Sequence, residues 1–210
     1  MNIEHYADKN DSLENQQLMD SSWADLTRAS VGLSIVALTL CGFVYISVAT
    51  GLGQVIFPDQ ANGSLILEND RVVGSRLVAQ PFIQTQYFQP RPSAAHYDPM
   101  AMAGSNMAVT NPALHQAIDT RLNKIAVQEQ IEKSKIPADL VTASGSGIDP
   151  EISVQSAFIQ VKRVAQLRQI SEQEVTKLVQ QYTVQPTFGI LGEARVNVLE
   201  LNLALDHIGK

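Results

Sequence analysis

The 210-residue sequence is poor in several kinds of residue, and each shortage excludes a class of protein. A single cysteine, Cys41, excludes an internal disulfide framework and a cysteine-cluster zinc or iron–sulfur site. Fifteen basic residues stand against 21 acidic ones, a net charge of −6 that argues against binding to nucleic acid. The four histidines lack His-x-x-His and His-x-x-x-His spacing, so we expect no metal site.

Catalytic motifs are missing as well. The chain has no Gly-x-Ser-x-Gly elbow, no phosphate loop ending in Gly-Lys-Ser/Thr and no Gly-x-Gly-x-x-Gly fingerprint. Asp98, beside Tyr97, has no partner nearby in the sequence, and loop aspartates of this kind are usually turn residues. We therefore expect no catalytic residue in this chain.

Charge is also absent from one continuous stretch. Residues 1–28 hold six acids and two bases, residues 29–58 hold no charged side chain, and residues 59–210 hold 15 acids and 13 bases. About 20 apolar residues in a helix cross a hydrocarbon core of ~30 Å. This division predicts a polar acidic tail (1–28), a transmembrane helix (29–54) and a soluble domain (59–210). The positions that define the span are Val31, Leu38, Cys41, Phe43 and Leu52.

A cleaved signal peptide is the alternative interpretation of the apolar stretch. Arg28 would be its basic residue and Ser47-Val48-Ala49 its cleavage site. The apolar run exceeds the usual ~7–15 residues and follows 28 mostly acidic residues, which favours a retained anchor. Arg28 lies next to the span, whereas the next base is Arg71, and this asymmetry favours a cytoplasmic N-terminus and an external C-terminal domain.

The remainder of the chain predicts a mixed α+β domain. Short apolar runs on either side of Glu68-Asn69-Asp70 indicate a hairpin, and residues 76–79 suggest a further strand. Helices are predicted after Asn111-Pro112, after Asp149-Pro150 and after Ser171, where a capping box begins. Residues 195–205 alternate apolar and polar at their start, so strand and helix compete there.

Two irregular segments are candidates for function. Residues 80–111 contain four prolines, and long ordered loops often carry partner contacts. The candidate contact residues there are Gln86, Tyr87, Phe88, Arg91 and Ser93.

Residues 141–150 form a glycine-rich loop before a predicted helix, where N–H groups can bind an anion. A turn capped by its own aspartate is the simpler interpretation. The candidate nucleotide or anion residues are Ser144, Gly145, Ser146, Gly147, Asp149 and Gln160.

Several motifs together resemble the C subunit of the Kdp potassium-transporting ATPase. They are QYFQPRPSA at 86–94, GSN at 104–106, VTASGSGIDP at 141–150, QVKRVA at 160–165 and GEARVNVLELNLAL at 192–205. The resemblance covers roughly residues 30–206 and includes the single preceding membrane helix. Residues 107–109 and Glu151 depart from the family pattern. The polar motif positions with an expected structural role are Arg163, Asn197, Glu200 and Asn202.

The resemblance implies a non-catalytic subunit of a complex in the bacterial inner membrane. Its partners would be a P-type ATPase subunit, a channel-like potassium-translocating subunit and a small hydrophobic subunit. The C subunit would be needed for assembly and would act as a catalytic chaperone that raises the affinity of the ATPase subunit for ATP. No cofactor is expected on this chain; ATP would bind within the complex, and potassium would be the transported ion. A direct nucleotide-binding module and a secreted periplasmic binding protein are the alternatives.

Overall fold

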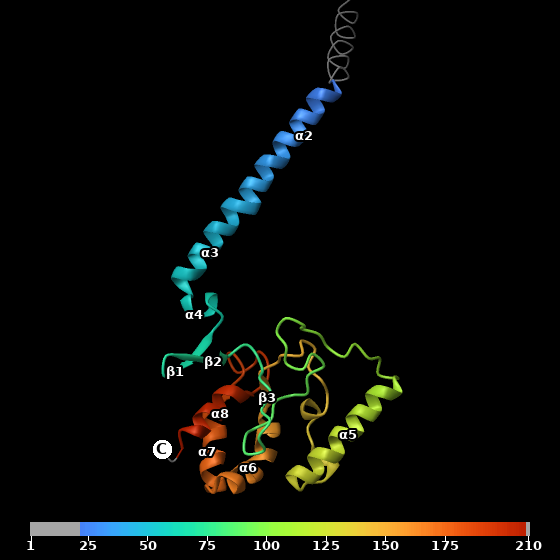
Figure 1. Cartoon of the computed structure of the whole chain (residues 1–210), viewed down its shortest axis with the longest axis vertical. Helices are drawn as coiled ribbons and strands as arrows, with labels where there is room; N and C mark the ends of the chain where they lie inside the picture. The colour runs from blue at the N-terminus through green and yellow to red at the C-terminus, as the bar shows by residue number, and fades with distance from the viewer. Residues whose placement is uncertain (1–21, 209–210) are drawn as a thin grey trace, which may run out of the picture. The chain divides into compact units, whose positions relative to one another are not determined.

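The structure is a computed structural model that describes residues 22–208, so most of the predicted polar tail (1–28) lies outside the described residues. The chain divides into two compact units, one ending at Asn62 and the other beginning at Gly63. Each is described by itself. Figure 1 colours the chain from blue near the N-terminus to red at the C-terminus and labels its α-helices.

The first unit contains one long apolar helix, from Trp23 to Ile56. Its 34 residues extend about 51 Å, which exceeds a hydrocarbon core of ~30 Å, so the helix is long and apolar enough to cross a membrane. Ser34 and Thr39 donate their hydroxyl hydrogens to carbonyls four residues earlier, so these polar side chains are satisfied within the helix. The helix consists of α2 (Trp23–Ala37), a π-helical segment η1 (Leu38–Val44) and α3 (Tyr45–Ile56), and a short α4 (Pro58–Ala61) follows.

The second unit mixes helices and strands, as the sequence predicts. Its strands are β1 (Leu65–Glu68), β2 (Arg71–Ser75), β3 (Glu151–Ser153), β4 (Thr183–Val184) and β5 (Arg195–Asn197). Its helices are α5 (Pro112–Glu129), the 3₁₀ turns η2 (Lys133–Lys135) and η3 (Ala138–Leu140), α6 (Val154–Arg168), α7 (Glu172–Gln181) and α8 (Val198–Asp206). Residues 80–111 run as turns and extended backbone between β2 and α5.

The predicted hairpin is confirmed, but the strand predicted at 76–79 is wrong. Strands β1 and β2 pair antiparallel with Glu68 opposite Arg71. Asn69 and Asp70 form the turn with φ of 51° and 61°, a left-handed conformation that both residue types tolerate. Residues 76–78 instead form a turn and a bend, and the backbone N–H of Ala79 donates to the carbonyl of Ile148 at 2.8 Å.

The core lies around α6, α7 and α8. Strands β3, β5 and β4 form a small antiparallel sheet in that order, in which Val196 pairs with both Ile152 and Thr183. Figure 1 shows the three helices as a group in orange to red, with α5 in yellow-green at one edge of the domain. The residues that are almost fully buried at the centre are Val164, Val175, Val179, Leu201 and Leu205.

Two of the three predicted helix starts are confirmed. Asn111 caps α5 with its side chain, and Ser171 forms a capping box with Glu174 at the start of α7. The start predicted at Asp149-Pro150 is wrong, because residues 151–153 pair with β5 and Ser153 caps α6 instead. In the competition at 195–205 both forms occur: β5 comes first, and Asn197 then caps α8.

Candidate partner-contact site

The two irregular segments that the sequence singles out lie against one another. We call residues 80–111 the long loop and residues 141–150 the glycine-rich loop. Arg91 Nη1 donates to Asp149 Oδ2 at 2.8 Å, and the Ser93 hydroxyl donates to the carbonyl of Gly147 at 2.6 Å. A Cβ on Gly147 would lie 2.7 Å from the carbonyl oxygen of Ala103, so only glycine fits this close approach. The glycine-rich loop therefore acts as a support for the long loop.

The long loop is also fastened to the last helix. Asn202 on α8 is buried; its Oδ1 accepts from the N–H of Phe88 at 2.9 Å, and its Nδ2 donates to the carbonyl of Phe88 at 3.0 Å. The Tyr87 hydroxyl donates to the Asp206 carboxylate at 3.0 Å, and the Arg168 guanidinium lies 4.6 Å from the Tyr87 ring centroid. Phe88 itself is 0% exposed, so it belongs to the core and no partner reaches it in this conformation.

A buried ion pair contacts the backbone of the long loop. Arg163 on α6 and Glu129 on α5 are 7% and 5% exposed, and Arg163 Nε lies 2.7 Å from Glu129 Oε1. The same guanidinium donates to the carbonyls of Thr85 and Tyr87. Burial raises the pKa of Glu129 above its ordinary value, and the charge of Arg163 offsets part of that rise. Among the described residues, Glu129 Oε2 has no hydrogen-bond partner.

The groups that would recognise a nucleotide are engaged within the domain. Gln160 is 1% exposed; its Oε1 accepts from the N–H of Gln89 at 2.7 Å, and its Nε2 donates to the carbonyls of Gln89 and Ser156. The Ser144 hydroxyl accepts from the N–H of Gly147 at 2.9 Å. Asp149 accepts from the N–H of Glu151 and pairs with Arg91. These side chains fix backbone positions, while Gly145 and Ser146 lie exposed at the turn.

A cavity of about 240 Å³ lies beside the long loop, but its polar lining is partly occupied. Pro90, Tyr97, Arg121, Ile125 and Leu140 are among the residues that line it. The Tyr97 hydroxyl donates to the carbonyl of Arg91 at 2.8 Å, and Arg121 donates to that of Val141. Burial raises the pKa of Tyr97, and Arg121 opposes the rise. Within residues 22–208, no group of three or more His, Cys, Asp or Glu side chains is placed to hold a metal ion.

The polar motif residues join elements that are far apart in the sequence. Arg163 links α6 to α5 and to the long loop, and Asn202 links α8 to Phe88. Asn197 donates to the carbonyl of Arg76 at 2.8 Å, and Glu200 pairs with the Arg76 side chain at 2.7 Å. Glu151, which departs from the family pattern, pairs with Arg195 at 2.8 Å across the small sheet.

Sequence reasoning missed the side chains that the long loop exposes. Ile83, Met100, Met102 and Val109 are large apolar residues on its surface, and Ile83 and Met100 are each 92% exposed. Their exposure has no sign in the sequence, because apolar runs such as Phe82-Ile83 and 100–103 occur in cores as well as on surfaces. The predicted contact residues Tyr87, Phe88, Arg91 and Ser93 instead hold the loop in place. Gln86 is half-buried, and its carbonyl accepts from Arg168.

The family model of KdpC, described as the c chain of the K⁺-transporting ATPase, matches residues 27–207. The chain belongs to the KdpC family. This confirms the resemblance inferred from the motifs.

Proteins similar to this chain carry the name "Potassium-transporting ATPase KdpC subunit". One from Xanthomonas campestris pv. campestris (strain B100) is 51% identical over 182 residues, 87% of each chain. One from Shewanella putrefaciens (strain CN-32 / ATCC BAA-453) is 49% identical over 177 residues, 84% of this chain and 89% of the relative. One from Gemmatimonas aurantiaca is 48% identical over 184 residues, 86% of this chain and 92% of the relative.

Proposed function

We propose that the chain is a non-catalytic accessory subunit of a high-affinity, ATP-driven potassium uptake complex. It is needed for assembly, and it acts as a catalytic chaperone that raises the affinity of the P-type ATPase subunit for ATP. Membership of the KdpC family and the printed names of the relatives support this role. Its partners are the P-type ATPase subunit, a channel-like potassium-translocating subunit and a small hydrophobic subunit.

One observation carries the mode of action. The long loop is fixed by buried side chains from α5, α6 and α8, yet it exposes Ile83, Met100, Met102 and Val109. An ordered loop loses little conformational freedom on binding, and exposed apolar side chains on it favour a protein partner. The long loop is therefore the surface through which the domain contacts the channel-like subunit.

Placement in the membrane determines how the domain can influence ATP. The apolar helix anchors the chain in the inner membrane, and Arg28 favours a cytoplasmic N-terminus and an external domain. An external domain cannot touch ATP bound on the cytoplasmic side, so its effect is a coupling free energy transmitted through the complex. The internal engagement of Gln160, Ser144 and Asp149 also makes direct nucleotide binding the weaker alternative.

The topology is tested with a C-terminal tag in right-side-out membrane vesicles. We expect protease to remove the tag while the chain stays full-length and membrane-bound until digestion, because the domain is external. An N-terminal tag on the same chain is the control and should be protected. Protection of the C-terminal tag would show that the domain is cytoplasmic. A shortened chain released from the membrane would support a cleaved, secreted protein.

The contact surface is tested by replacing Ile83, Met100 and Val109 together with serine. We expect the other subunits to co-purify with the variant about tenfold less well, because exposed apolar anchors supply much of the binding free energy. Residual complex should show a raised KM for ATP. The control is Val127→Ser on α5, a comparably exposed apolar residue outside residues 80–111. Unchanged co-purification by the triple variant would contradict the proposed contact.

A further inference from the structure

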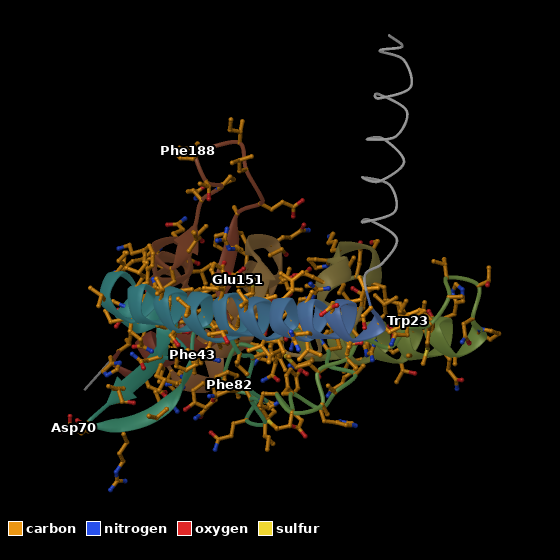
Figure 2. All side chains as sticks on the ribbon, turned by 90° about the horizontal axis from the view of Figure 1, so that it is seen from above. Trp23, Phe43, Asp70, Phe82, Glu151 and Phe188 are labelled. Carbon is orange, nitrogen blue, oxygen red and sulfur yellow. The ribbon has the colours of Figure 1, made fainter. Side chains whose placement is uncertain are left out.

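A second apolar surface lies far along the chain from the long loop. Between β4 and β5, residues 186–192 form a turn that carries Phe188, Ile190 and Leu191, which we call the apolar tip. Phe188 is 89% exposed, Ile190 82% and Leu191 60%. Figure 2 shows Phe188 at the end of a loop that stands away from the body of the domain. These three side chains contribute little to the core.

The backbone of the turn is nevertheless well fixed. Thr187 and Leu191 exchange both backbone hydrogen bonds at 2.9 Å, and the N–H of Gly189 donates to the carbonyl of Pro186 at 2.9 Å. Strands β4 and β5 pair antiparallel at the base of the loop. The apolar tip is therefore presented in one defined conformation.

Phe188 is unfavourable for the stability of the domain in two ways, through its backbone conformation and through its exposed ring. Its φ of +56° lies in the left-handed region, which is unfavourable for a bulky aromatic residue and is usually taken by glycine or asparagine. Its exposed ring also gains almost no burial. Gly189, with φ of +75°, meets the same backbone requirement without strain. An aromatic side chain at Phe188 is thus explained by contact with something outside the domain.

We propose that the apolar tip inserts into an uncharged apolar pocket on another subunit of the ATPase, an inference that rests on the proposed function. Residues 184–192 contain no charged side chain, so the complementary surface is apolar and uncharged. A fixed turn with an aromatic at its apex suits a shaped protein pocket, because preorganisation lowers the cost of binding. A fluid bilayer adapts to any apolar side chain, so a fixed conformation of the turn would add no affinity for it. The tip also lacks the basic residues that attract anionic lipid headgroups.

The small size of the tip defines its role. Three side chains are far fewer than the ~20–30 residues that each side of a stable interface contributes. The tip therefore acts as a local anchor that adds to contacts made elsewhere on the chain. Attachment of the domain to a membrane helix raises its effective concentration near the other subunits, so a small anchor suffices.

A single tryptophan reports the environment of the tip. The chain has one tryptophan, Trp23, so the double variant Trp23→Phe, Phe188→Trp places the only indole at the apex. We expect its emission to shift to the blue and to resist acrylamide quenching in the purified complex, but not in the same chain reconstituted alone in lipid. Trp23→Phe with Val127→Trp is the matched control and should stay accessible in both samples.

Two results of this measurement would overturn the proposal. An indole that stays quenchable by acrylamide in the complex would show that no pocket receives the tip. Quenching of the chain alone by brominated lipids would identify the bilayer as the occupant.

Co-purification separates this proposal from the proposed function. Phe188→Ser should lower the yield of complex about tenfold or more, the range of an interface hot spot, while Val127→Ser leaves it unchanged. If the serine variants of the long loop lose the complex and Phe188→Ser does not, the proposed function stands and the anchor is refuted. If the natural chain fails to co-purify with the other subunits, the proposed function itself fails.

Discussion

Replacing Arg163 by alanine is expected to lower the free energy of unfolding by about 3–5 kcal/mol, the usual cost of breaking a buried ion pair. The change would leave the carboxylate of Glu129 buried without its cation, and Gln160 Oε1 would lose a donor. The carbonyls of Thr85 and Tyr87 would also lose their guanidinium contact, so the long loop should loosen. Urea unfolding of the full chain in a mild detergent, followed by circular dichroism, measures the loss.

Two further variants make this prediction specific. Lys135→Ala removes an exposed ion pair with Glu132, and we expect a change of less than about 1 kcal/mol. Arg163→Met combined with Glu129→Leu removes both charges and should recover much of the lost stability, because no uncompensated charge remains buried. A loss for Arg163→Ala no larger than that for Lys135→Ala would refute the structural role of the buried pair.

Phe88→Ala is expected to cost about 3–5 kcal/mol, the range for truncating a buried phenylalanine. The ring is completely buried among core residues of the helices, and its backbone is held by Asn202. A cavity at this position would therefore destabilise both the core and the long loop. Urea unfolding gives the stability, and cleavage within residues 80–111 by a protease under native conditions reports the loop.

The same substitution at Phe188 is the natural control for this prediction. Phe188 is exposed and in a left-handed conformation, so Phe188→Ala should change the free energy of unfolding by less than about 0.5 kcal/mol. Equal losses at the two positions would contradict the assignment of one ring to the core and the other to an external contact.

Local features of the fold were predictable because they depend on residues within a few positions of one another. The Asn111-Pro112 start of α5, the Ser171 capping box and the β1–β2 turn are of this kind. Asp149-Pro150 has the same local appearance as a helix start. Residues 151–153 form a strand instead, because they pair with the distant β5, and the local sequence contains no information about that pairing.

The two loops of the candidate site were identifiable in the sequence, but the contacts that their side chains make were not. The sequence identified residues 86–93 and 144–149 as unusual, yet it could not show that Arg91 pairs with Asp149. Tyr87 and Phe88, next to each other in the sequence, have different environments: the Phe88 ring is buried in the core, whereas the half-buried Tyr87 directs its hydroxyl to Asp206. Exposure of Met100 or Phe188 depends in the same way on which distant elements cover the chain, so it emerged only from the fold.

The contacts between the long loop and α8 also set the order in which the domain can mature. Asn202 follows Phe88 by 114 residues, and Asp206 follows Tyr87 by 119. At a synthesis rate of ~5–20 residues per second, the loop is synthesised on the order of ten seconds before Asn202 and Asp206 of α8. Until then, the hydroxyl of Tyr87 and the backbone of Phe88 lack these partners. Within residues 22–208, α8 is the last helix in chain order, so these contacts form only after the other described helices have been synthesised.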